Sequence, residues 1–232
     1  MPTLDAVLQD IDHCAQRAGR PAGSVRLIAV SKSQPAAAIA ALAAQGQRAF
    51  GENYAQEAMT KIPALATAGL EWHFLGPVQR NKARIVSAHF DWLHSLDSLP
   101  LAHSLARHLQ TAGRTLKVLI GVNSLEDGTK QGLTREAVPA FLDGFLADPA
   151  LARVLHLRGL MTIGPHQAPA DTSARCFGAL RDTLETCARR FALPQFDQLS
   201  MGMSDDYRIA IAEGATMVRI GRALFGERPR KA

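Results

Sequence analysis

The sequence has few cysteines and no long apolar run, and we expect no leader. Its three cysteines, Cys14, Cys176 and Cys187, form no pair at a metal-ligand spacing such as C-x-x-C, so we expect reduced thiols in a cytoplasmic protein. No stretch approaches the roughly 20 apolar residues that cross a bilayer. Residues 1–20 carry early acids and lack the apolar segment of a signal peptide. We therefore expect no membrane partner.

The sequence motifs typical of nucleotide or zinc sites are also missing. There is no G-x-G-x-x-G, no Walker sequence and no H-E-x-x-H, so we expect no metal. The formal net charge of +5 suggests affinity for anions, but outside residues 226–232 the basic residues are spread along the chain. A spread of this kind is typical of a solvated surface, and we expect no nucleic-acid partner.

What the sequence does contain is a regular alternation of strand and helix patterns after a leading helix at residues 3–18. Strands are predicted at residues 25–30, 48–53, 71–76, 90–96, 115–123, 154–163, 196–202 and 216–221. Helices are predicted at residues 35–46, 54–66, 78–88, 98–113, 134–148, 170–191, 204–214 and 222–225, with a polar loop at residues 124–133. Such alternation implies parallel pairing, and eight units in 232 residues match one (β/α)8 barrel domain over residues 1–232. A doubly wound open sheet is the alternative, but its glycine-rich first turn is absent.

A lysine follows the first predicted strand. In a (β/α)8 barrel the site lies at the carboxyl ends of the strands, which is where Lys32 falls in the stretch LIAVSKSQP. Partial burial lowers the pKa of a lysine and makes it a nucleophilic amine. The alternative is an ordinary lysine that points to water.

The last two strands end in segments that suit an anion. Ser204 is a natural helix N-cap, and Gly221 stands at a strand-to-helix turn where backbone N–H groups can approach a ligand. Loops after strands 7 and 8 frequently form a phosphate site in barrels. Arg219 alternates with apolar neighbours, so we expect it to point into the barrel and to need an acceptor from a ligand. Plain capping and tight turns are the alternative. An amine after strand 1 with a phosphate site after strands 7 and 8 is what pyridoxal phosphate requires.

Several stretches resemble the pyridoxal phosphate homeostasis proteins, a family with the barrel fold of the alanine racemase N-terminal domain. They are LIAVSKSQP, FGENYAQEAMTK, WHFLGPVQRNK, LHSLDS, LRGLMTI and LSMGMSDD with ATMVRIGRALFGER, and they span residues 27–228. The resemblance implies a Schiff base between pyridoxal 5'-phosphate and Lys32. It implies that Ser204 and the backbone of Gly221 and Arg222 hold the phosphate, with Arg219 close to the cofactor. The remaining implied contacts are Asn53 and His73, which line the pocket, and Ser200 and Met201 on the strand beside it.

The sequence departs from the family at Arg222. The residue after RIG is often Thr or Ser in the family, and its hydroxyl can bind phosphate. Here the backbone N–H of Arg222 can still serve, while its side chain either adds a charged contact or points to solvent. From the residues alone, His73 could also be an ordinary buried histidine and Asn53 a helix cap.

The family implies a monomeric carrier and buffer of pyridoxal phosphate, with little or no catalysis, that supplies pyridoxal-phosphate-dependent apoenzymes. The alternative is an amino-acid racemase or another enzyme that uses this cofactor. Two-base racemisation needs a second acid or base, which alanine racemases take from a tyrosine of a second domain. The sequence ends soon after Gly221, so we expect no such domain, and Tyr54 and Tyr207 are weak replacements. A cofactor-free Schiff-base aldolase also fits a reactive lysine.

Overall fold

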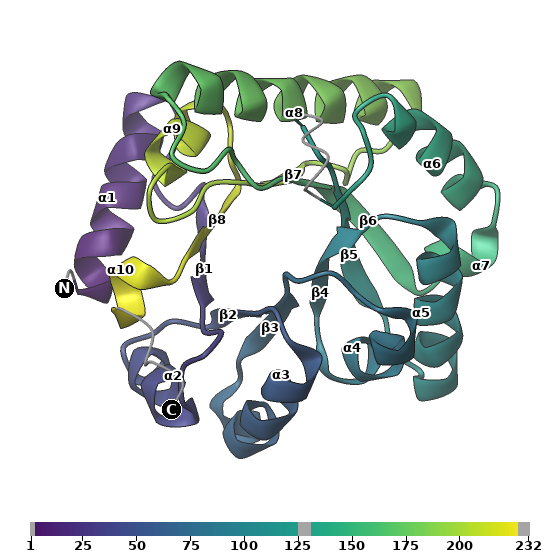
Figure 1. Ribbon diagram of the computed structural model, residues 1–232, viewed down its shortest axis with the longest axis horizontal. Coiled ribbons are helices and arrows are strands. Elements are labelled where there is room, and N and C mark those ends of the chain that lie inside the picture. The colour runs from purple at the N-terminus through teal and green to yellow at the C-terminus, as the bar shows by residue number, and fades with distance from the viewer. Residues whose placement is uncertain (1–2, 125–130, 227–232) are drawn as a thin grey trace.

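Eight parallel strands close into a barrel in chain order, and β1 pairs with β8 (Figure 1). The computed structural model describes residues 3–124 and 131–226. The strands are β1 (Arg26–Val30), β2 (Ala49–Glu52), β3 (Glu71–Phe74), β4 (Trp92–Leu96), β5 (Leu116–Gly121), β6 (Leu155–Met161), β7 (Gln198–Ser200) and β8 (Met217–Ile220). The predicted (β/α)8 barrel is therefore confirmed.

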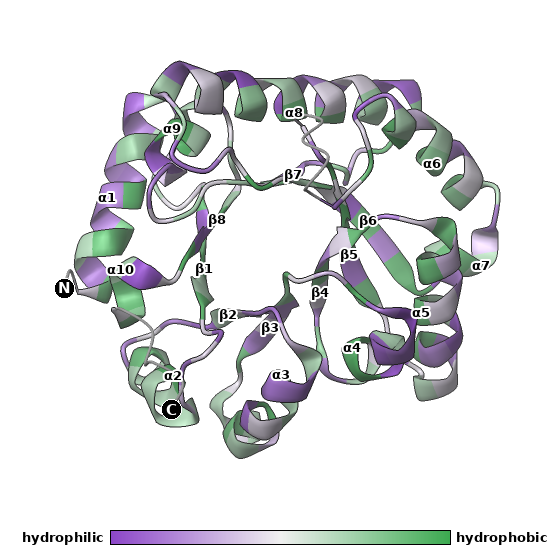
Figure 2. Ribbon diagram, viewed as in Figure 1, coloured by the Kyte–Doolittle hydropathy of each residue, from purple (hydrophilic) through white to green (hydrophobic). Residues whose placement is uncertain are grey.

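Helices surround the ring of strands, and α1 packs beside α9 and α10 (Figure 1). They are α1 (Leu4–Arg17), α2 (Ala36–Ala44), α3 (Ala55–Lys61), α4 (Ala83–His89), α5 (Leu99–Ala112), α6 (Ala137–Leu146), α7 (Pro149–Ala152), α8 (Ala170–Arg190), α9 (Tyr207–Ala212) and α10 (Arg222–Phe225), with 3-10 turns η1 (Pro63–Ala68) and η2 (Arg80–Lys82). Figure 2 shows α2 in hydrophobic colours along its length, whereas α8 mixes hydrophilic and hydrophobic residues. Within the described residues, no helix combines the length and apolarity needed to cross a membrane.

Prolines account for the main differences from the predicted helices. The helix predicted at residues 54–66 ends as α3 at Lys61, because Pro63 begins the separate turn η1. The segment after α6 forms the extra helix α7, which has Pro149 at its first position and the Asp148 side chain as its N-cap. The loop predicted at residues 124–133 lies mostly at residues 125–130, outside the described part of the chain.

Alternating strand residues divide the core into two layers. Ile28, Ala49, Trp92, Leu119, Met161 and Met217 form a small cluster inside the barrel. A larger cluster, which we term the helix-side core, packs the outer faces of the strands against the helices and includes Phe50, Val218 and Ile220. Because side chains alternate along a strand, Arg219 falls on the inner face between Val218 and Ile220. The barrel interior therefore holds both an apolar cluster and charged groups.

Candidate functional site

Lys32 lies two residues beyond β1, at the ring formed by the carboxyl ends of the strands, which we term the barrel mouth. It is half-buried. The last residue of β1, Val30, pairs with Gly51 of β2 on one side. On the other side lies Gly221, where a Cβ atom would stand 3.1 Å from the Val30 carbonyl oxygen. The glycine at 221 therefore lets the turn after β8 lie against the strand that carries Lys32.

The turn after β7 differs from the prediction that Ser204 caps a helix. Helix α9 begins at Tyr207, and Asp206 occupies its N-cap position. The Asp206 carboxylate accepts the N–H of Met203 at 2.6 Å, and the Asp206 N–H donates to the Met203 carbonyl at 3.1 Å. This local ring of hydrogen bonds makes residues 204–206 a turn, so Asp205 and Asp206 precede the helix. Ser204 remains half-buried in that turn, beside the mouth.

Arg222 joins the turns after β7 and β8. Its Nη2 donates to Asp205 Oδ2 at 2.7 Å, and the two side chains are 65% and 71% exposed. An ion pair this exposed contributes little stability. The guanidinium is thus engaged by a carboxylate, while the backbone N–H of Arg222, at the start of α10, has no acceptor within its own helix.

Arg219 points into the barrel, as alternation predicts, and is only 5% exposed. Its Nη1 donates to Ser200 Oγ at 2.8 Å, and its Nη2 donates to the Thr162 carbonyl oxygen at 2.8 Å. The protein itself supplies two acceptors, and the three other N–H groups of the guanidinium leave room for the predicted contact with a ligand. Burial lowers the pKa of Arg219 to about 10, which leaves the guanidinium charged at neutral pH.

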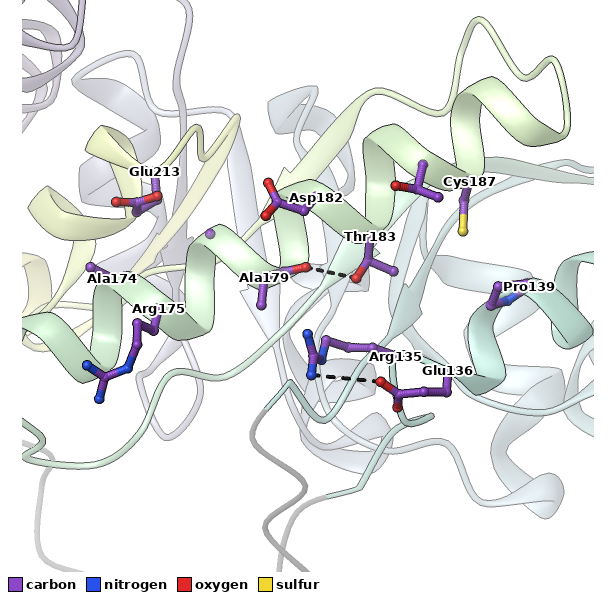
Figure 3. A pocket seen from close by; sticks show the side chains of 12 residues that line it. Arg135, Glu136, Pro139, Ala174, Arg175, Ala179, Asp182, Thr183, Cys187 and Glu213 are labelled. Carbon is purple, nitrogen blue, oxygen red and sulfur yellow. Dashed lines mark hydrogen bonds and ion pairs between the residues drawn. The ribbon is translucent and has the colours of Figure 1, made fainter.

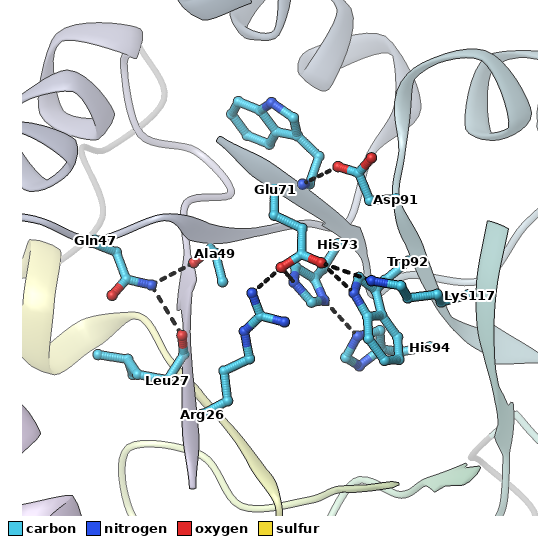
Figure 4. Close-up of polar contacts among 11 residues, drawn as sticks. Arg26, Leu27, Gln47, Ala49, Glu71, His73, Asp91, Trp92, His94 and Lys117 are labelled. Carbon is cyan, nitrogen blue, oxygen red and sulfur yellow. Dashed lines mark hydrogen bonds and ion pairs between the residues drawn. The ribbon is translucent and has the colours of Figure 1, made fainter. Parts of the chain in front are cut away.

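A row of buried polar side chains continues from Ser200 through the barrel. Ser200 Oγ lies 2.8 Å from His94 Nδ1, and His94 Nε2 lies 2.9 Å from His73 Nδ1 (Figure 4). Both imidazoles are completely buried, and the His73 ring stacks on Trp92 with 5.6 Å between centroids. His73 therefore reaches Arg219 through two intermediates. His94 was not among the predicted site residues, although alternation in FDWLHSL puts it on the same face as Trp92.

The hydrogens of this row run in one direction. A guanidinium only donates, so Ser200 Oγ accepts from Arg219, and we assign the Ser200 hydrogen to the bond with His94 Nδ1. We therefore assign the His94 hydrogen to Nε2, which donates to Nδ1 of His73. Burial lowers the pKa of both histidines, that of His94 well below its usual value, so both are neutral. The remaining hydrogen, on His73 Nε2, faces Glu71 Oε2 across 3.6 Å.

Glu71 ends the row at the amino end of β3. The Trp92 indole donates to its Oε1 at 2.6 Å, Arg26 pairs with its Oε2, and Lys117 Nζ lies 3.5 Å from its Oε1 (Figure 4). Burial raises the pKa of the Glu71 carboxyl, but the N–H of the neutral His73 and the charge of Arg26 outweigh that effect and lower it to about 2. A carboxylate thus lies at one end of the row and a guanidinium at the other.

We expect Glu71→Gln to remove stability that depends on pH. The folded-state pKa of about 2 lies below the ordinary value of 4.5. The ionised group therefore stabilises the fold fully above about pH 4.5, and this contribution is lost as pH falls toward 2. At neutral pH the free energy of unfolding of the variant should be lower than that of the wild type by a few kcal/mol. Denaturant titration measures this difference. The difference in unfolding free energy between the wild type and the variant should decrease as the pH falls from about 5 to about 3. A difference independent of pH would contradict this assignment.

Asn53 and Met201 differ in their access to the mouth. Asn53 follows β2 and is half-buried; Tyr54, not Asn53, occupies the N-cap position of α3. A Cβ atom at Gly76 would stand 2.3 Å from the Asn53 carbonyl oxygen, so the loop after β3 packs against Asn53. Met201 is completely buried and belongs to the helix-side core. Its backbone follows β7, while its side chain contributes packing.

A cavity of about 670 Å³ lies beside α6 and α8 (Figure 3). Its lining includes Arg135 and Glu136 before α6, Gly178 and Asp182 on α8, and Glu213 after α9. None of the predicted site residues lines this cavity. A smaller cavity of about 370 Å³ includes Glu71 and Lys117 at the amino ends of the strands.

Comparison with known proteins identifies relatives over nearly the whole chain. The model of the alanine racemase N-terminal domain matches residues 3–229. The pyridoxal phosphate homeostasis protein of Escherichia coli is 44% identical over 229 residues, which is 97% of this chain and 95% of the relative. The protein of that name from Pseudomonas aeruginosa is 44% identical over 218 residues, 94% of this chain and 91% of the relative.

Solved structures of other proteins have a similar fold. PipY of Synechococcus elongatus, solved with PLP bound, is 41% identical with a TM-score of 0.79, over 93% of this chain and 100% of that one. Alanine racemase from Corynebacterium glutamicum, 21% identical with a TM-score of 0.67 over 98% of this chain and 62% of that one, shares the fold. The 44% identity to these relatives, over 97% and 94% of this chain, shows that the chain belongs to the pyridoxal phosphate homeostasis protein family.

Proposed function

We propose that this protein binds pyridoxal 5'-phosphate through Lys32 and carries or buffers the cofactor, with little or no catalysis of its own. The observation that carries the proposal is the convergence at the mouth of a half-buried amine and a glycine turn. Lys32 follows β1, and Gly221 lies against Val30 of the same strand. The PLP-bound PipY structure and the names of the relatives support this choice of ligand.

The residues at the mouth fit the cofactor. Because Gly221 has no Cβ atom, its turn packs against Val30 beside Lys32, and the backbone N–H groups of this turn are available to a phosphate. Ser204, half-buried in the adjacent turn, offers a hydroxyl, and Arg222 offers a backbone N–H at the start of α10. We assign the phosphate to these three residues, and Asn53 to the rim of the pocket.

When bound, pyridoxal phosphate would supply an aldehyde, and Lys32 would hold it by condensing its amine with that aldehyde, with loss of water. Arg219 lies below the mouth, and Ser200 and Thr162 fix its guanidinium. Because a guanidinium only donates hydrogen bonds, Arg219 facing the pyridine nitrogen would keep that nitrogen unprotonated and weaken the ring as an electron sink. His73, His94 and Ser200 act on the cofactor through Arg219.

The two tyrosines favour a carrier over a racemase. The Tyr207 hydroxyl donates to Asp10 on α1, and burial together with that bond raises the pKa of Tyr207 to about 12. A hydroxyl held in this way is a poor acid or base near neutral pH. Tyr54 is 59% exposed at the start of α3. We therefore propose that Lys32 works without a second catalytic base. We also propose that the protein is a cytoplasmic monomer that transfers the cofactor to apoenzymes.

An absorption spectrum with added pyridoxal 5'-phosphate, recorded before and after borohydride, tests the function. We expect a visible imine band that disappears on reduction and a mass increase on the peptide that carries Lys32. An adduct on another lysine would reject the assignment. If no band formed, the carrier and racemase functions would both be rejected, and the cofactor-free aldolase would remain.

A further inference from the structure

The motif FGENYAQEAMTK brings three charged residues together that the cofactor site does not use. Lys61 at the end of α3 is 4% exposed, and Glu52 at the end of β2 is fully buried. Lys61 Nζ donates to Glu52 Oε1 at 2.8 Å and to Glu57 Oε1 at 2.6 Å. Glu57 is half-buried. Burying the charges of Lys61 and Glu52 costs free energy unless both are paired, so we asked what this cluster stabilises.

The cluster holds the turn that carries Lys32 from both sides. Lys61 Nζ also donates to the carbonyl oxygen of Ser31 at 2.8 Å, immediately before Lys32. Glu57 Oε1 accepts the N–H of Ser33, immediately after Lys32. The two backbone groups that flank Lys32 are thus attached to one ion pair of α3.

Two further contacts define the turn. Ser31 Oγ donates to Glu52 Oε1 at 2.6 Å, and the Gln34 N–H donates to the Ser31 carbonyl at 3.0 Å. Ser33 has a φ of 63°, a left-handed conformation that is unfavourable for residues other than glycine. Its bond to Glu57 stabilises the conformation, which is strained where the chain leaves β1.

Lys61 is not a second reactive amine. An ammonium has three hydrogens, and the acceptors Ser31, Glu52 and Glu57 use all three. Glu52 and Phe50 both lie on the outer face of β2, so the cluster lies between the barrel wall and α3. Its effect on the mouth therefore passes through the backbone of the Lys32 turn.

We propose that Glu57 and Lys61 are positioning residues for Lys32: their ion pair holds the turn at residues 31–34 so that the amine faces the mouth. This inference rests on the proposed function, because it assumes that Lys32 forms the covalent adduct. The pair orients the backbone on either side of Lys32 before the ligand arrives. Pre-orientation of this kind speeds attack on an aldehyde, because the amine has less conformational freedom to lose.

Glu57→Ala tests the proposal, with Glu57→Gln as the conservative variant and Gln56→Ala, on an exposed position of the same helix, as the control. In apo protein, Glu57→Ala should speed exchange of the Ser33 amide hydrogen by about tenfold or more, because a bond to a charged acceptor is lost. With pyridoxal 5'-phosphate added, formation of the borohydride-trapped adduct on Lys32 should slow by about tenfold. The pH profile of adduct formation should also shift. Glu57→Gln keeps an acceptor oxygen and should restore most of both readouts.

The outcomes separate this inference from the function. If the wild type forms the adduct on Lys32 but Glu57→Ala leaves its rate and pH profile unchanged, the positioning role is overturned and the function stands. If the wild type forms no adduct on Lys32, the function itself fails, and the inference fails with it. Equal slowing in Gln56→Ala would show a general effect on α3 and would also overturn the positioning role.

Discussion

Replacing Lys32 by alanine should abolish the covalent adduct with pyridoxal 5'-phosphate and leave the barrel folded. The loss should be complete, because no other group at this position can form the C=N bond. The fold should tolerate the change, since Lys32 is half-buried in a turn and belongs to neither core cluster. Absorption spectra and peptide mass after borohydride measure the adduct, and thermal unfolding measures the fold.

Lys82→Ala provides the matched control for Lys32→Ala. Lys82 is also half-buried and lies in η2, which follows β3. This control should keep the visible band and the mass increase on Lys32. A Lys32→Ala protein that stays yellow and keeps a reducible adduct would contradict the attachment site.

Arg219→Ala should weaken cofactor binding by about tenfold or more, whereas Arg222→Ala should change it by less than about threefold. Arg219 is buried, and its removal deprives Ser200 and the Thr162 carbonyl of their donor. Arg222 is 65% exposed, and only its backbone is assigned to the phosphate. Titration of apo protein, followed by absorption, gives both affinities.

Arg219→Ala also leaves a buried void, so the comparison needs a stability control. Arg219→Lys keeps a positive charge and should recover part of the affinity, while thermal unfolding shows that each variant is folded during titration. Equal losses in Arg219→Ala and Arg222→Ala would show that the Arg222 side chain leaves Asp205 and binds the phosphate.

The barrel and the position of its mouth could be predicted because both depend on short-range patterns. The alternation of strands and helices predicts the parallel barrel, and alternation within β8 places Arg219 inside. Lys32 and Gly221 were expected at the mouth because each follows a strand. These predictions need only residues that are neighbours in the chain.

Contacts between distant segments could not be predicted in the same way. Sequence alone made Ser204 a helix cap, but the Asp206 carboxylate binds the Met203 N–H and the helix begins later. The two protein acceptors of Arg219 lie at the end of β7 and just after β6, so the sequence alone did not reveal them. Lys61 falls inside the helix predicted at residues 54–66, and its burial against the turn after β1 depends on a segment distant in the sequence. In each case tertiary packing decides which partner a polar group finds.

The one-way row from Arg219 to Glu71 also explains how a buried guanidinium keeps its charge without touching a carboxylate. Each neutral group in the row, Ser200, His94 and His73, directs its hydrogen toward Glu71 and its lone pair toward Arg219. Their dipoles therefore add head to tail, with the negative ends facing the guanidinium. Aligned dipoles favour a cation at one end and an anion at the other, as in a helix macrodipole. The hydrogen-bonded row inside the barrel thus extends the electrostatic effect of Glu71 to Arg219, below the mouth.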